Sequence, residues 1–153
     1  MYLSPQDYLF HRSPMLLIEH IETIAPESVT CSVALNSAQL APFLEPQGLP
    51  AYFGIELMAQ TVGIWSGYQD KCAGRAAAQG GLILSVRAFE AQQPYILGPQ
   101  DVPLIITMQK LMQDRNYASF EGSISQNEHT VATGRLSLCQ LDAELEHQLG
   151  FSA

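Results

Sequence analysis

The stretch from Ala51 to Tyr68 constrains the fold more than any other part of the chain. It reads AYFGIELMAQTVGIWSGY, and Glu56 is its only charged residue. The stretch is longer than a typical strand and is apolar nearly all round when drawn as a helix. Such a helix is either buried or spans a membrane, and Glu56 and Gln60 interrupt the apolar run too early for a span. We therefore expect a central helix that other elements enclose.

Alternating and continuous apolar runs predict those enclosing elements. Before the central helix we expect a short helix from Ser4 to about Leu9, strands over Met15–Ile24 and Val29–Leu35, and a loop over Asn36–Pro50. After it we expect four strands and a short last helix, at Leu82–Ala91, Val102–Gln113, Tyr117–Ser125, Thr130–Leu141 and Glu144–Leu149. One apolar helix with about six strands predicts an α+β fold, in which an antiparallel sheet curls around the helix.

Composition narrows the classes of function. The 153 residues suit a single domain over 1–153, and 47% apolar against 14% charged residues allow a real core. A net charge of -8 without a basic cluster argues against nucleic acid and anionic membranes as partners. Cys31, Cys72 and Cys139 have no metal-binding spacing, and the first residues lack a secretory pattern. We expect a cytoplasmic protein with reduced, buried or half-buried thiols and no metal.

Two motifs resemble one enzyme family. The segment His11–Glu19 (HRSPMLLIE) resembles the H-R-x-P-x-L-L-V-D opening of the 3-hydroxyacyl-acyl-carrier-protein dehydratases. The segment Gly54–Gln60 (GIELMAQ) resembles their central-helix motif, in which an acid precedes A-M-A-Q. The resemblance implies a hot-dog fold, a homodimer with sheets joined edge to edge, and an acyl carrier protein as partner. It also implies a substrate carried on phosphopantetheine and no other cofactor.

One departure from the family concerns the loop before the helix. The dehydratases carry a G-H-F-P segment there, whose histidine is the usual catalytic base, whereas Pro42–Pro50 reads PFLEPQGLP and contains no histidine. The chain thus resembles a divergent branch, such as the dehydratase-like hot-dog proteins found beside aryl-polyene or polyketide-type lipid genes.

Loss of water from a 3-hydroxyacyl thioester needs a base at C2, an acid for the C3 hydroxyl and donors for the enolate-like oxygen. Glu56 is the candidate acid, because burial in an apolar helix favours a protonated carboxyl. Gln60 lies on the same helical face and either orients that carboxyl, contacts substrate or ties the helix to the sheet.

The remaining candidates lie just before Glu56 in the sequence or open the first of the two motifs. Backbone amides around Ala51 to Gly54 are candidate donors to the thioester oxygen, and Gly54 permits either that approach or simple helix–strand packing. Phe53 is a candidate contact for the acyl chain, although helical apolar residues are more often plain core. His11 is a second-rank substitute for the missing base, although a histidine before a strand is more often structural.

Three functions stay open on the sequence alone. The first is a dehydratase of carrier-bound 3-hydroxyacyl chains in fatty-acid or polyene-type synthesis. The second is a non-catalytic hot-dog partner, which completes a site together with a histidine-bearing homologue. The third is a hot-dog acyl thioesterase, a type that often needs only one helix-borne carboxylate and polarising amides.

Overall fold

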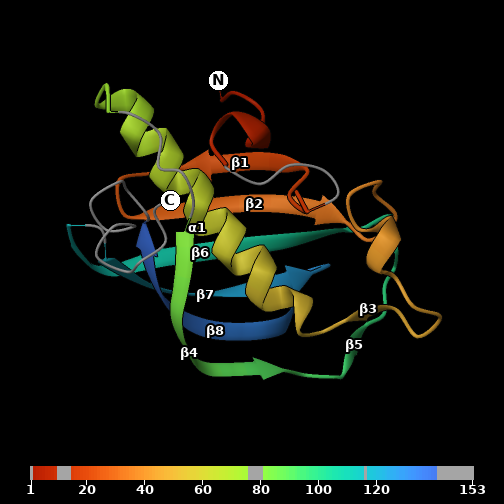
Figure 1. The fold of residues 1–153 in the computed structure, drawn as a ribbon. Coiled ribbons are helices and arrows are strands. Elements are labelled where there is room, and N and C mark those ends of the chain that lie inside the picture. Colours follow the sequence, from red (N-terminus) through yellow and green to blue (C-terminus); the bar gives the residue numbers. More distant parts are fainter. Residues whose placement is uncertain (1, 10–14, 76–80, 116, 141–153) are drawn as a thin grey trace, which may run out of the picture.

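The computed structural model describes residues 2–9, 15–75, 81–115 and 117–140. Its elements follow the order predicted from the sequence (Figure 1). They are the 3-10 helices η1 (Pro5–Asp7) and η2 (Ala41–Phe43), the helix α1 (Phe53–Cys72), and the strands β1 (His20–Ile24), β2 (Ser28–Ala34), β3 (Leu49–Pro50), β4 (Gly81–Ala91), β5 (Tyr95–Ile96), β6 (Pro103–Asp114), β7 (Tyr117–Gln126) and β8 (His129–Gln140). The helix predicted at Glu144–Leu149 lies outside the described residues.

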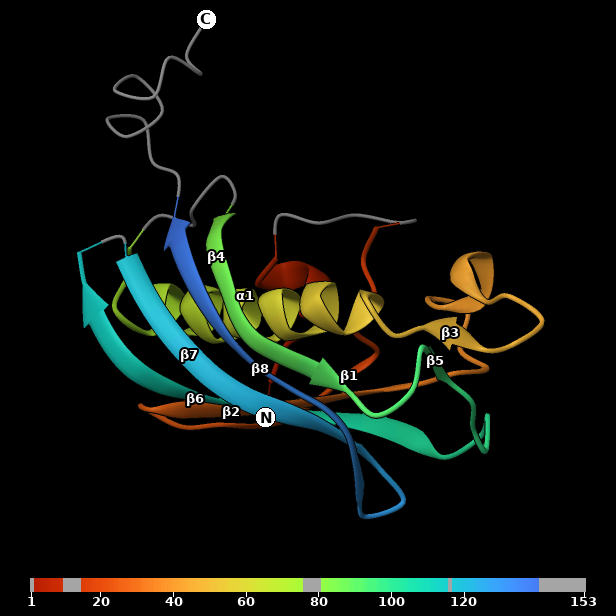
Figure 2. The same ribbon diagram turned by 90° about the horizontal axis from the view of Figure 1, so that it is seen from below.

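Six strands form one antiparallel sheet in the order β1-β2-β6-β7-β8-β4, and β3 pairs with β5 beside it. Figure 2 shows the sheet as a curved layer with α1 lying along its concave side. The helix contacts β2, β6, β7, β8 and β4. The predicted hot-dog architecture, a curled antiparallel sheet around a long central helix, is therefore confirmed.

The core lies between α1 and the sheet, which explains why the helix is apolar on most sides. Leu57, Met58 and Ile64 of α1 are fully buried. The Trp65 ring meets Phe120 of β7 edge-on, at 5.2 Å between ring centroids, and its indole N–H donates to the Ala25 carbonyl at 3.0 Å. These contacts fix the helix against the sheet along most of its length.

The N-terminal segment, defined here as residues 2–9, covers the side of α1 that the sheet leaves open. A Cβ on Gly67 would lie 2.2 Å from the Tyr8 carbonyl oxygen, and one on Gly63 would lie 2.7 Å from Leu9 Cδ2. Only glycine permits so close an approach of backbone to helix. The Tyr68 ring also meets Tyr2 and Tyr8 edge-on, so the segment is held against the second half of α1.

The strand predicted from Met15 begins at His20 instead, which corrects that boundary. The physical reason is that the Met15 carbonyl and the Leu17 amide form hydrogen bonds to the Gln60 side chain. Backbone groups bound to the helix in this way do not join a strand ladder. The two-residue strands β3 and β5 fall where loops were predicted, because pairs this short carry no alternation to detect.

Candidate active site

Glu56 and Gln60 form the polar centre of α1. Gln60 is fully buried and Glu56 is half-buried, on the first two turns of the helix. Gln60 Nε2 donates to Glu56 Oε1 at 3.1 Å and to the Met15 carbonyl at 2.7 Å, while Gln60 Oε1 accepts the Leu17 amide at 2.9 Å. Both amide hydrogens of Gln60 are thus used inside the protein. The geometry orients one oxygen of the Glu56 carboxyl and ties the helix to residues 15–17.

The helix start holds the predicted amide donors. The Ala51 amide donates to the Pro94 carbonyl at 2.8 Å, and the Gly54 amide donates to the Ala51 carbonyl at 2.9 Å. Within the described part of the chain, no backbone carbonyl accepts the amides of Tyr52 and Phe53. These two amides lie at the positive end of the helix, and their role as donors to a thioester oxygen stays a prediction.

Gly54 is enclosed by the sheet. A Cβ at this position would lie 3.1 Å from Ile124 Cδ1 and 3.2 Å from Phe89 Cζ. This contact agrees with the helix–strand packing interpretation of Gly54. A role of Gly54 toward substrate stays a prediction.

Aromatic rings gather at the same end of α1. Phe53 is half-buried, and its ring lies 5.0 Å from the Phe43 ring of η2 and 5.0 Å from the stacked Tyr52 ring. Tyr52 is 64% exposed. By contrast, Met58, Val62 and Trp65, which are also helical apolar residues, are buried in the core. Among the described residues at this end of the helix, the Tyr52 and Phe53 rings therefore stay candidates for contact with an acyl chain.

No histidine of the described residues is enclosed with Glu56. His20 lies on the edge strand β1 with a side chain 68% exposed, and His129 is exposed where β8 begins. The loop Pro42–Pro50 brings Phe43 to the helix start, in the region where the dehydratases carry their histidine. His11 lies outside the described residues, and its role stays a prediction.

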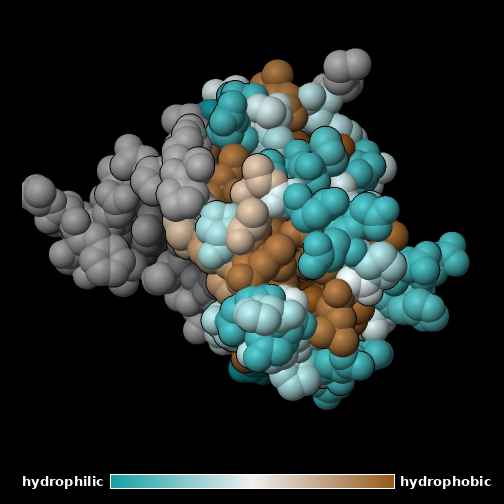
Figure 3. All heavy atoms as spheres, turned by 90° about the vertical axis from the view of Figure 1, so that its right-hand side faces the viewer, coloured by the Kyte–Doolittle hydropathy of each residue, from teal (hydrophilic) through white to brown (hydrophobic). Residues whose placement is uncertain are grey.

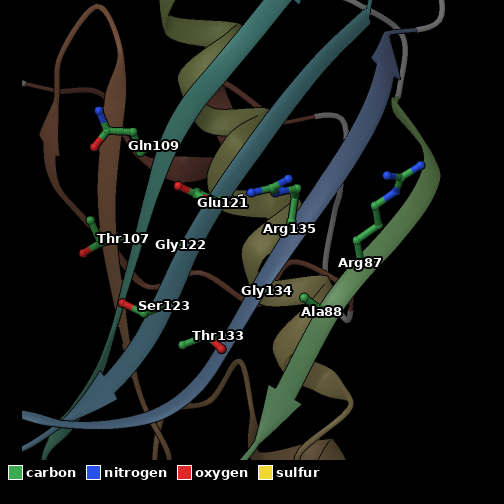
Figure 4. Close-up of a pocket in the computed structure, with 10 residues that line it drawn as sticks. All are labelled: Arg87, Ala88, Thr107, Gln109, Glu121, Gly122, Ser123, Thr133, Gly134 and Arg135. Atoms are coloured by element: carbon green, nitrogen blue, oxygen red, sulfur yellow. Dashed lines mark hydrogen bonds and ion pairs between the residues drawn. The ribbon is translucent and has the colours of Figure 1, made fainter.

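A separate hollow of about 580 Å³ lies on the sheet face away from α1 (Figure 4). Arg135 there bonds Glu121 at 3.0 Å and stands opposite Arg87 across the β8–β4 pair, with Ser123 and Thr133 nearby. Glu56 does not line this hollow. The sheet therefore separates these arginines from the candidate acid.

Two cysteines differ in exposure. Cys31 is buried, and burial raises the pKa of its thiol to about 12. Cys72 at the end of α1 is exposed, whereas we expected a buried or half-buried thiol.

Within the described ranges, no group of three His, Cys, Asp or Glu side chains is placed to hold a metal ion. Among the same residues, no helix has the length and apolarity needed to cross a membrane.

A curled antiparallel sheet around a long central helix defines a hot-dog protein, and this helix carries the acid Glu56 in its first turn. The family model described as ApeP dehydratase matches residues 3–149, and the chain belongs to this ApeP-like family. No curated protein matches the chain significantly.

Solved structures agree with this assignment. The chain is similar to one in the dehydratase heterocomplex ApeI:P from Xenorhabdus doucetiae, with 36% identity, coverage of 99% of this chain and 100% of that chain, and a TM-score of 0.92. A phenylacetic acid degradation protein PaaI from Thermus thermophilus shares 16% identity over 79% of this chain and 91% of that chain, with a TM-score of 0.57. A hypothetical thioesterase with coenzyme A from Streptococcus pneumoniae shares 16% identity over 80% of this chain and 84% of that chain, with a TM-score of 0.58. The last two likenesses concern the fold alone.

Proposed function

We propose that this chain is one subunit of a dehydratase for 3-hydroxyacyl thioesters, and that a second, histidine-bearing hot-dog protein completes its site. The observation that carries the proposal is the likeness over full length to a chain of a dehydratase heterocomplex. The loop Pro42–Pro50, which lacks the usual histidine, supports a heteromer over a self-sufficient homodimer. Polyene-type chain synthesis in the cytoplasm, on an acyl carrier protein, is the setting we infer from the family.

In this proposal Glu56 is the general acid. The partner's histidine removes a proton from C2 of the substrate, and Glu56 gives its proton to the C3 hydroxyl, which leaves as water. The products are the 2-enoyl thioester and water. Gln60 is a positioning residue, because its bond to Glu56 Oε1 restricts the rotation of the carboxyl group. The amides of Tyr52 and Phe53 stabilise the thioester oxygen as charge develops on it.

Charge suggests how the two subunits divide their tasks. This chain has seven basic against fifteen acidic residues, and acyl carrier proteins are usually acidic as well. Like charges repel, so an acidic carrier gains little from docking on this subunit. We therefore propose that the partner subunit supplies most of the surface that binds the carrier protein.

The test is an intact-mass assay of a 3-hydroxyacyl carrier-protein thioester. The substrate is incubated with this chain alone, with a histidine-bearing hot-dog homologue alone, and with both. Loss of water mainly in the mixture supports the proposal. Equal loss of water with this chain alone would favour a self-sufficient dehydratase, in which His11 is the first residue to replace. Release of free thiol without an enoyl product would replace the proposal by the thioesterase alternative.

A further inference from the structure

The exposed Tyr52 ring is an unusual feature of the helix start. A tyrosine ring normally buries much of its area, and an exposed apolar surface next to a polar site often marks a binding surface. Here the Tyr52 ring is 64% exposed, although its other face stacks on Phe53 with 25° between the ring planes. Phe53 in turn rests on Phe43. Because the Phe43 and Phe53 rings meet at a tilt of 44°, the three rings form a supported cluster whose outermost residue, Tyr52, is exposed.

Tyr52 and Glu56 lie on the same face of α1. Four residues separate them, and the Tyr52 backbone has helical angles (φ -63, ψ -20). Side chains four apart on a helix are neighbours, and they lean toward the helix start. The Glu56 carboxyl therefore extends toward the turn that presents the Tyr52 ring.

The surroundings of this aromatic cluster are also apolar. Figure 3 views the end of the molecule that carries η2, β3 and β5, and apolar side chains gather in its middle between polar ones. Leu97, which follows β5, is 58% exposed, and Phe43 and Leu44 are half-buried. An acyl chain that reaches Glu56 across this end meets apolar surface before it meets the acid.

We propose that Tyr52 is a specificity-determining residue that selects planar, conjugated acyl chains over saturated ones by stacking on them beside Glu56. This inference rests on the proposed function, since it concerns the same site. A flat conjugated chain offers its whole face to the ring, whereas a saturated chain is corrugated and has no π system. The supporting Phe53 and Phe43 rings hold Tyr52 in place, so little conformational entropy is lost when a chain stacks on it.

The experiment measures equilibrium binding of two probes of equal length, sorboyl-pantetheine (a conjugated dienoyl thioester) and hexanoyl-pantetheine (saturated). Each is titrated into the full chain and into its complex with the histidine-bearing homologue. The ratio of the two dissociation constants reports the selectivity. Wild type is expected to prefer the sorboyl probe, and Tyr52→Leu to reduce this ratio by about 2- to 12-fold, the range of a typical aromatic stacking contribution.

Two further variants control the result. Tyr52→Phe keeps the ring and is expected to keep the ratio. Leu111→Ala removes an exposed apolar side chain of β6 and is expected to leave the ratio unchanged. The inference is overturned if wild type shows no preference, if neither probe binds, or if Tyr52→Leu keeps the wild-type ratio.

Binding and turnover separate the two proposals. A Tyr52-dependent preference without any loss of water from a 3-hydroxyacyl substrate would leave the inference standing and remove the proposed dehydratase function. Loss of water without a Tyr52-dependent preference would support the dehydratase function and overturn the role of Tyr52.

Discussion

The two halves of α1 differ in what lies against their side away from the sheet. The second half packs against the N-terminal segment on the side away from the sheet, because Gly67 admits the Tyr8 backbone and Gly63 admits the end of the Leu9 side chain. The first half carries the half-buried Glu56 and ends in the exposed Tyr52 ring. We call the half that packs against the N-terminal segment the sealed half, and the half that carries the candidate acid Glu56 the open half.

Gln60 lies at the boundary between the two halves. This buried side chain bonds Met15 and Leu17 on one side and Glu56 on the other. The N-terminal part of the chain and the candidate acid are therefore connected through this residue. Changes in the sealed half should alter stability, and changes in the open half should alter chemistry.

The largest effect on stability is expected for Gln60→Met, which keeps the volume of the side chain but removes its hydrogen bonds. The Leu17 amide and the Met15 carbonyl lose their partner, at about 1 to 3 kcal/mol for each buried group. Denaturant unfolding measures the loss. The matched control is Gln69→Met on the same helix, whose bond to the Ala25 carbonyl is long, at 3.4 Å, and exposed, and a change within about 0.5 kcal/mol is expected there. Equal effects at both positions would contradict the boundary role of Gln60.

Gly67→Ala tests the seal itself. The new methyl would lie 2.2 Å from the Tyr8 carbonyl oxygen, and backbone must move to make room. Overpacking of this kind costs about 1 to 3 kcal/mol. Thermal or denaturant unfolding checks the value, and limited proteolysis near residue 8 reports release of the segment. A variant as stable as wild type would show that the close contact is not required.

Gly63→Ala should have a smaller effect than Gly67→Ala. Its methyl would meet only the end of the Leu9 side chain, which can rotate away, and alanine is favoured over glycine in a helix by about 1 kcal/mol. The two contributions oppose each other, so a net change within about 1 kcal/mol is expected. A greater loss of stability in Gly63→Ala than in Gly67→Ala would contradict the assignment of Gly67 as the tightest contact.

Thiol labelling distinguishes the core next to β2 from the end of α1 without changing the sequence. Burial raises the pKa of Cys31 to about 12, so this thiol is protonated at about pH 8 and shielded from reagents. Cys72, the last residue of α1, is exposed. Labelling at about pH 8 followed by peptide mass spectrometry should modify Cys72 rapidly and Cys31 only after unfolding. Early labelling of Cys31 in the native protein would show that the layer between α1 and β2 opens.

Patterns in single segments predicted much of this molecule. The apolar run around Glu56 predicted α1, and alternation predicted β2 and the four strands after the helix to within one or two residues. Contacts between distant segments were not predictable in this way. The bonds of Gln60 to Met15 and Leu17, the contact of Gly67 with Tyr8, and the support of Phe53 by Phe43 all depend on how the chain packs. The motif around Glu56 indicated the acid, but only the fold reveals that Tyr52 is exposed beside it.

The most direct test of the account compares Glu56→Gln with wild type for both water loss and thermal unfolding, in the presence of the histidine-bearing homologue. Glutamine keeps an oxygen that can accept the bond from Gln60, but it has no acidic proton to transfer to the substrate hydroxyl. We expect Glu56→Gln to unfold at a temperature close to that of wild type, with turnover reduced at least about a hundredfold. Wild-type turnover in a folded Glu56→Gln complex would contradict the assignment of the open half of α1 as the reactive one.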